Sequence, residues 1–170
     1  MNGNREGLPA DGIGRSRVTV PETWVGRDGW LTPAFCLKIF DDAGDALTRL
    51  AGMGEEYTRL THNSWVALES HLAFVAPAGA GDELVVESCV IDLDPRKIHV
   101  YQMLCREDRL LATHEQLGLH FNTETRRSCP FEPVVHAALE QLRVARAARP
   151  WPAGAGRRIR LAHDAGEATV

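Results

Sequence analysis

A change in hydrophobic period partway along the chain restricts the folds that it can adopt. In its first part, apolar residues recur at spacings of three and four, as on one face of a helix, at Cys36, Phe40, Ala43, Leu47 and Leu50. Thr32 is a suitable N-cap, and Pro33 falls at the first helical position, where its missing N–H costs nothing. Gly52 and Gly54 supply the stop. The pattern predicts a long helix of about five turns that begins at Pro33 and stops at these glycines.

After this helix the period falls to two, which is the period of a strand. The segment 64–76 alternates in this way. One face carries Val66, Leu68, Leu72 and Phe74, and the other carries Trp65, Glu69, His71 and Val75. Short turns separate this segment from three more with strand character, at 83–94, 96–105 and 109–122. Because short turns join these four strands, we expect an antiparallel sheet.

Three further elements complete the prediction: a first strand at 18–25, a second helix at 131–148 and a short terminal strand at 157–162. The apolar face of the long helix has to be buried, and the sheet offers the surface for it. We therefore predict an α+β fold in which an antiparallel sheet wraps around one long central helix.

The length of 170 residues suits one domain with a substantial core. We expect a disordered, Gly-rich lead-in at 1–16, the folded domain at 17–149, and a linker and tail at 150–170.

A net charge of −4 offers no basic surface, so nucleic acid is not an expected partner. No apolar run approaches the roughly 18 residues that span a bilayer, and the first residues do not read as a signal peptide. We expect a cytoplasmic protein with no membrane partner.

The reactive residue types show few motifs. The four cysteines form no CxxC pair and the seven histidines no HExxH or other ligand spacing, so we expect buried thiols and no metal site. His114 and His120 lie at even separation on one strand, which is typical of packing. Ser64 and Ser70 lack a GxSxG elbow, so a serine nucleophile is not favoured.

Several separated segments resemble the hotdog-fold thioesterases, and within them the betainyl-CoA thioesterase group. The helix "AFCLKIFDDAGDAL" is similar to that group's helix, and "ALESHLAFV" resembles its Thr-Leu-Glu-Ala-His strand. The likeness continues through "PRKIHVYQML", "LLATHEQLGLHFN" and "GRRIRL", and so covers residues 18–161. It implies a hotdog fold and an acyl-CoA substrate with no further cofactor. It also implies a homodimer or homotetramer whose site lies between subunits, the loop of one facing the strand of the other.

The loop "GRDGWLT" before the helix departs from that family. The family loop reads Asp-Tyr-Asn-Gly-His, and its Asp is the usual catalytic carboxylate. Aligned on Gly29, this chain has Gly26 in place of the Asp, Asp28 in place of the Asn and Trp30 in place of the His. A carboxylate is therefore missing from its register, and another stands two residues later.

Thioester hydrolysis requires a base or nucleophile and donors for the developing oxyanion. The unpaired amides at a helix N-terminus are such donors, which here nominates the amides of Gly29, Trp30, Leu31 and Thr32, or that of Ala34. Glu69 is the first candidate for the carboxylate, with His71 on the same face to orient it or a water. The alternative for this pair is a satisfied contact within a dimer interface. Asp28 is the second candidate, and its alternative is a role in an Asp-Gly turn.

Aromatic and basic residues supply the remaining candidates. Trp30 could line an acyl pocket or offer a cation–π face, and its alternative is to pack in the core. Phe35 and Trp65 are further candidates for the pocket. Arg96 and Lys97, with Arg106 and Arg109 across a hairpin, could bind the phosphates of coenzyme A or form a solvated edge.

These residues favour an acyl-CoA thioesterase that acts on a small or polar acyl group. The alternative is a hotdog protein that binds acyl-CoA without hydrolysing it, which the replacements at Gly26 and Trp30 favour. Hydratase chemistry would require an Asp or His at the start of the helix, where Pro33 and Ala34 stand.

Overall fold

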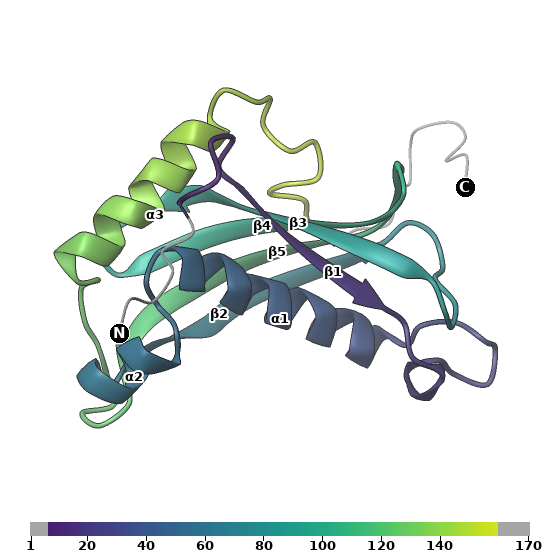
Figure 1. Ribbon diagram of the computed structural model, residues 1–170, viewed down its shortest axis with the longest axis horizontal. Coiled ribbons are helices and arrows are strands. Elements are labelled where there is room, and N and C mark those ends of the chain that lie inside the picture. The colour runs from purple at the N-terminus through teal and green to yellow at the C-terminus, as the bar shows by residue number, and fades with distance from the viewer. Residues whose placement is uncertain (1–6, 160–170) are drawn as a thin grey trace.

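The computed structural model describes residues 7–159 of the chain. Its centre is a six-stranded antiparallel sheet in the order β1-β3-β4-β5-β2, with the short β6 paired to β5 (Figure 1). The strands are β1 (Ile13–Thr19), β2 (Asn63–Phe74), β3 (Glu83–Leu93), β4 (Lys97–Arg106), β5 (Arg109–Asn122) and β6 (Arg127–Ser128). The helices are α1 (Pro33–Leu50), α2 (Glu55–Thr61) and α3 (Pro133–Arg146), with a single 3₁₀ turn at Glu22–Trp24.

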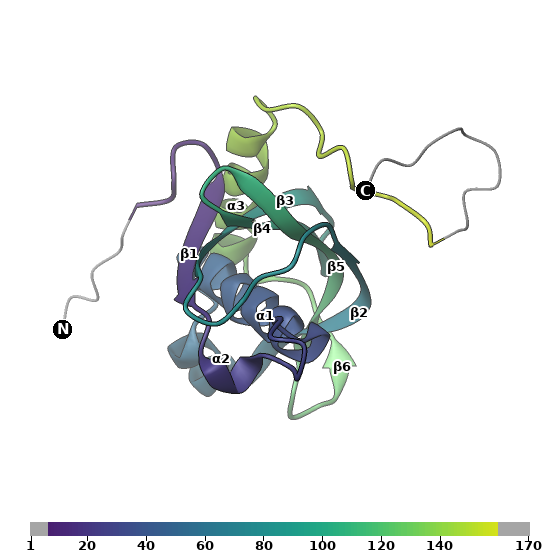
Figure 2. The ribbon, with the colours of Figure 1, turned by 90° about the vertical axis from the view of Figure 1, so that its right-hand side faces the viewer.

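Helix α1 lies inside the curl of the sheet, as the predicted α+β class requires (Figure 2). Its buried side includes Phe40 and Leu47, which are 0% and 1% exposed. Phe40 belongs to the apolar cluster around the start of α1, and Leu47 belongs to the cluster beneath α3. The helix begins at Pro33 and ends at Leu50, which confirms the prediction from sequence. No helix in the described part of the chain is long and apolar enough to cross a membrane.

Some predicted boundaries are wrong. Strand β1 begins at Ile13, inside the segment predicted to be a lead-in, and the predicted strand 18–25 contains the 3₁₀ turn instead of continuing. The short α2 was not predicted. Residues 157–159 form no strand, and the rest of the predicted terminal strand lies outside the described residues. The strand signal at 13–16 is weak in the sequence because Ile13 is the only apolar side chain among these four residues.

A β-bulge at Leu68 decides which side chains of β2 face α1. The register places Ala67 opposite Gly118 and Glu69 opposite Leu117, so Leu68 has no partner on β5. A bulged residue shifts the alternation of the residues that follow it. Trp65 therefore shares the inner face with Ser70 and Leu72, while Glu69 and His71 lie on the outer face. The prediction that Trp65 and Glu69 share a face is wrong.

A chain of polar side chains crosses the core beneath α1. The Oγ of Ser70 lies 2.5 Å from Nε2 of His114, and Nδ1 of His114 lies 2.7 Å from Oε1 of Gln102. The Gln102 amide nitrogen donates to the carbonyl of Phe40 at 2.8 Å and to Ser88 Oγ at 3.0 Å. This chain ties β2, β5, β4 and β3 to α1, and it satisfies polar groups whose burial would otherwise be costly.

Gly118 on β5 provides a test of this packing. A Cβ at this position would lie 2.8 Å from Cζ3 of the Trp65 ring, closer than carbon atoms approach. We expect Gly118→Ala to lower the free energy of unfolding by about 1–3 kcal/mol in urea titrations. Gly7→Ala is the control, since a Cβ there meets nothing within 4 Å, and its effect should stay within about 0.5 kcal/mol. Equal effects of the two changes would contradict this packing.

His114 makes the stability dependent on pH. Burial, helped by the nearby His71, lowers the pKa of His114 to about 4, whereas an unfolded histidine titrates near 6.5. Between these values the unfolded chain binds more protons, so acidification favours unfolding. We expect up to about 3 kcal/mol of stability, fully present above pH 6.5, to be lost as the pH falls to 4.

The measurement is urea unfolding of the wild type and of His114→Gln at several pH values across this range. The variant should be less stable at pH 7.5 but should lose less stability on acidification than the wild type. Parallel losses in the two proteins would show that other groups carry the dependence.

Candidate active site

The loop before α1 is held by backbone hydrogen bonds to the β2–β3 connection and to the 3₁₀ turn. Leu31 donates its N–H to the carbonyl of Ala78 at 2.8 Å, and Thr32 donates to the carbonyl of Trp24 at 3.1 Å. Earlier in the loop, Gly26 and Gly29 close a tight turn in which the Gly29 N–H donates to the Gly26 carbonyl at 3.0 Å. Gly29 has a φ of 81°, a left-handed conformation that favours glycine. The loop is thus a fixed entry to the N-terminus of α1.

These bonds correct the predicted oxyanion donors. The amides of Gly29, Leu31 and Thr32 have backbone acceptors, and the Trp30 N–H donates to Oδ1 of Asp28 at 3.1 Å. All four amides are therefore occupied within the chain. The next free candidates are Ala34 and Phe35, whose N–H groups have no acceptor among the residues that the structure describes.

The Asp28 carboxylate lies where the loop lacks a side chain. A Cβ placed on Gly26 would sit 2.9 Å from Oδ1 of Asp28. The carboxylate therefore reaches the space into which a side chain at residue 26 would extend. Asp28 is exposed, so one of its oxygens holds the Trp30 amide while the other stays accessible. The bond to the Trp30 amide also gives Asp28 the role in an Asp-Gly turn that the sequence analysis set against a catalytic role.

An apolar cavity of about 300 Å³ lies beside this loop at the start of α1. It is lined by side chains from the loop, from α1 and from the ends of β2, β4 and β5: Trp30, Leu31, Pro33, Cys36, Phe74, Leu104 and Leu111 among them. Burial raises the pKa of the Cys36 thiol to about 11, so this thiol is protonated at neutral pH and is no nucleophile.

The three predicted pocket aromatics do not meet. Trp30 lines the cavity and is 49% exposed, whereas Phe35 stacks on Trp24 with ring centroids 5.2 Å apart. Trp65 lies over Gly44, toward the other end of α1, and its Nε1 donates to Oδ1 of Asp45 at 3.2 Å. Of these three aromatic residues, only Trp30 lines the cavity within one protomer.

Glu69 and His71 share a face, as predicted, but it is the face away from α1. Glu69 is exposed there, and His71 stands opposite Glu115 on β5. Glu115 in turn binds Nε2 of His99 at 2.7 Å and accepts the N–H of Gly156 at 2.8 Å. Within one protomer, Glu69 therefore does not face the loop or the N-terminus of α1.

The predicted coenzyme A residues also separate. Arg96 lies in the β3–β4 turn and Lys97 is the first residue of β4, and the backbone amides of both donate to Oδ1 of Asp94 at 2.7 Å. Arg106 and Arg109 lie at the opposite end of β4, which is the end nearer the loop. Arg106 is already paired with Asp82 at 2.6 Å. The four cations do not form one phosphate site in a single protomer.

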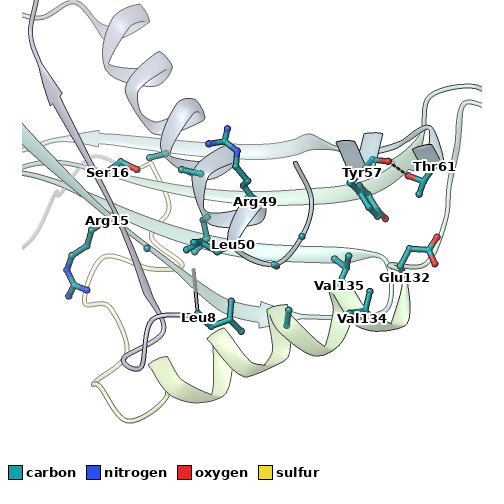
Figure 3. Close-up of a pocket in the computed structure, with 18 residues that line it drawn as sticks. Leu8, Arg15, Ser16, Arg49, Leu50, Tyr57, Thr61, Glu132, Val134 and Val135 are labelled. Carbon is teal, nitrogen blue, oxygen red and sulfur yellow. Dashed lines mark hydrogen bonds between the residues drawn. The ribbon is translucent and has the colours of Figure 1, made fainter. Parts of the chain in front are cut away.

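A second cavity lies elsewhere and is larger than the one beside the loop. It measures about 870 Å³ and lies between α1, β1 and α3, with Leu50, Val134 and Val135 directed into it (Figure 3). Glu132 is the only carboxylate among its lining residues, and no residue of the predicted site lines it.

Ser70 and His114 are the polar pair that the sequence analysis did not nominate. His114 was predicted to be a packing residue on one face with His120, and both are buried and hydrogen-bonded. Its bond to Ser70, however, depends on the bulge at Leu68. The sequence signal is the recurrence of polar residues at even separation on β5, at His114, Gln116 and His120.

Comparisons with known proteins agree with this fold. The model of the thioesterase-like superfamily matches residues 20–139. The betainyl-CoA thioesterase of Pseudomonas aeruginosa is 35% identical over 84% of this chain and 90% of that protein. The L-carnitine dehydrogenase/betainyl-CoA thioesterase of Ruegeria pomeroyi is 30% identical over 83% of this chain, which spans only 29% of that longer protein.

Solved structures lead to the same family. A protein of Pseudomonas putida described as a candidate thioesterase is 31% identical, with a TM-score of 0.76 over 88% of this chain and 96% of that one. A hypothetical protein of Staphylococcus aureus, solved in complex with CoA, has a TM-score of 0.83 over the same shares at 21% identity, which shows the fold alone. The chain belongs to the thioesterase-like superfamily, and its sheet curled around one helix is the hotdog fold of that family.

Proposed function

We propose that this chain is an acyl-CoA thioesterase in which Asp28 replaces the carboxylate missing at Gly26. The observation that carries the proposal is the position of the Asp28 carboxylate, 2.9 Å from where a Cβ on Gly26 would lie. The chain thus supplies a carboxylate to the same space from two residues later. The thioesterase names of relatives that it matches along most of its length support the reaction.

The proposed chemistry uses two groups at the start of α1. The thioester oxygen accepts from the free amides of Ala34 and Phe35, which the helix dipole makes favourable for negative charge. Asp28 takes a proton from a water whose oxygen attacks the carbonyl carbon. The tetrahedral intermediate then expels the thiolate, which takes up that proton and leaves as coenzyme A, and the acyl group leaves as its acid.

We propose that the active site is completed by a second copy of the chain, in a homodimer or a pair of homodimers. Strand β2 is an edge of the sheet, and its Val66 and Leu68 are 41% and 51% exposed. A long apolar edge strand is a template for pairing with another chain. Antiparallel pairing of two β2 strands would bring the Arg96 and Lys97 end of one copy toward the loop end of the other. These cations are then the candidates for the coenzyme A phosphates, with Arg109 as the nearer alternative.

The same pairing favours a small cationic acyl group, in line with relatives named for betainyl-CoA. It would bring Asp41, Asp45 and Trp65 of one copy toward the loop of the other. Burial raises the pKa of the Asp41 carboxyl, and the neighbouring Asp45 and Asp42 raise it further. Crowded carboxylates beside an indole suit a trimethylammonium group, which neutralises charge and binds aromatic faces.

Replacing Asp28 tests the catalytic assignment. We expect Asp28→Asn to lower kcat for the best acyl-CoA substrate by about 10²–10⁴-fold, because the base is lost while the turn is kept. Release of free thiol from a panel of acyl-CoA esters that includes betainyl-CoA measures this rate. Glu69→Gln is the matched control and should keep turnover within about threefold, since Glu69 lies on the outer face. A retained rate in Asp28→Asn, or a loss confined to Glu69→Gln, would overturn the assignment.

The non-hydrolytic alternative makes a different prediction. With Gly26 and Trp30 in place of the family residues, a binding protein would release no thiol from any ester in the panel. Coenzyme A esters would still raise the thermal midpoint by mass action. We expect both turnover and a raised midpoint, and a raised midpoint without turnover would favour the binding protein.

A further inference from the structure

Ser70 is a polar side chain on the inner face of β2, which is the face toward α1. Trp65 and Leu72, its neighbours on that face, pack in the two apolar clusters of the core. Ser70 itself is exposed, although the rest of its hydrogen-bonded chain is deeply buried: His114 is 1% exposed and Gln102 2%. The buried chain therefore ends at the hydroxyl of a surface residue on the unpaired edge of the sheet.

The direction of each hydrogen bond in this chain follows from its buried end. Gln102 uses its amide nitrogen as the donor to the Phe40 carbonyl and to Ser88, so its Oε1 is an acceptor. Nδ1 of His114 must therefore carry the proton that it shares with Oε1. Nε2 of the neutral ring is then an acceptor, and Ser70 donates its hydroxyl proton to it. The Ser70 oxygen is left with two lone pairs and no proton to give.

This arrangement differs from a Ser–His nucleophile in one respect. A nucleophilic serine passes its proton to a histidine that a carboxylate keeps basic. Here burial lowers the pKa of His114, and the neutral amide of Gln102 cannot offset the charge of an imidazolium. The ring thus fixes the Ser70 hydroxyl without readily taking its proton, and Ser70 acts as an oriented acceptor.

We propose that the Ser70 oxygen accepts a hydrogen bond from the reacting complex, in the site that β2 of one copy forms with the loop of another. The inference rests on the proposed function and assigns to Ser70 the place on β2 that the sequence analysis gave to Glu69. The donor is an O–H or N–H group. Two groups of the complex have this chemistry. One is the attacking water, which would give one proton to Asp28 and donate the other in a hydrogen bond to Ser70. The other is an amide N–H of the pantetheine arm of coenzyme A.

Steady-state kinetics of three variants test the proposal. Ser70→Ala removes the acceptor, and Ser70→Thr keeps a hydroxyl on a strand that tolerates β-branched residues. Glu69→Gln changes the adjacent residue on the opposite face. We expect Ser70→Ala to lose about tenfold in kcat/KM, while Ser70→Thr and Glu69→Gln stay within about threefold of the wild type. A fall in kcat at constant KM identifies the water as the donor, and a rise in KM at constant kcat identifies the pantetheine amide.

A structural role for Ser70 predicts another result. Ser70→Ala leaves Nε2 of His114 without its donor, so some loss of stability is expected, and all rates are taken well below each variant's thermal midpoint. Unchanged kcat and KM in Ser70→Ala would overturn the proposal, as would an equal loss in Ser70→Thr. If Asp28→Asn is inactive while Ser70→Ala matches the wild type, this inference fails and the proposed function stands.

A second measurement does not require turnover. A non-hydrolysable thioether analogue of the acyl-CoA is titrated into the ¹⁵N-histidine-labelled wild-type protein, and the His114 Nε2 resonance is followed. We expect this resonance to shift, since a new donor on the Ser70 oxygen strengthens the bond that Ser70 donates. If the analogue binds and the resonance does not move, Ser70 makes no contact with the complex, whether or not the wild type hydrolyses acyl-CoA.

Discussion

Burial of one face of α1 is the constraint on which the rest of the structure depends. Phe40 and Leu47 are almost fully covered, and the sheet has to curl to cover them from several strands at once. The curl leaves the N-terminus of α1 at an open end, beside an apolar cavity. The loop that holds Asp28 is pinned there by the bond from Leu31 to Ala78. Core packing thus sets the position of the proposed catalytic groups.

The polar chain from Ser70 to Gln102 crosses the same core. Buried histidine and glutamine side chains are tolerated because each nitrogen and oxygen has a partner, including the Phe40 carbonyl of α1 itself. Among the described residues, no buried side-chain nitrogen or oxygen lacks a partner. A satisfied network of this kind fixes the rotation of α1 against β4 and β5, and it delivers one oriented hydroxyl to the edge of the sheet.

The loop shows how a carboxylate can reach the space beside one position from a residue two places later. Gly26 and Asp28 differ from the family pattern together, and the carboxylate of the second fills space beside the first. A turn of this kind tolerates the exchange because Asp28 also accepts the Trp30 amide and so helps to hold the loop that displays it. Sequence alignment alone shows that the family's Asp is absent at Gly26. The folded loop places the Asp28 carboxylate beside that position.

The sequence by itself determined the long helix, the order of the four later strands and the family, since these follow from local period, capping residues and segments that keep their order. It also identified Asp28 as one of two candidate carboxylates. Only the tertiary structure decided that Glu69 faces away from α1, that the amides of Gly29 to Thr32 are occupied, and that Ser70 meets His114. The physical reason is that each of these depends on a register or a long-range bond. One bulged residue, Leu68, reverses every side chain after it, and nothing in the local pattern of β2 marks it.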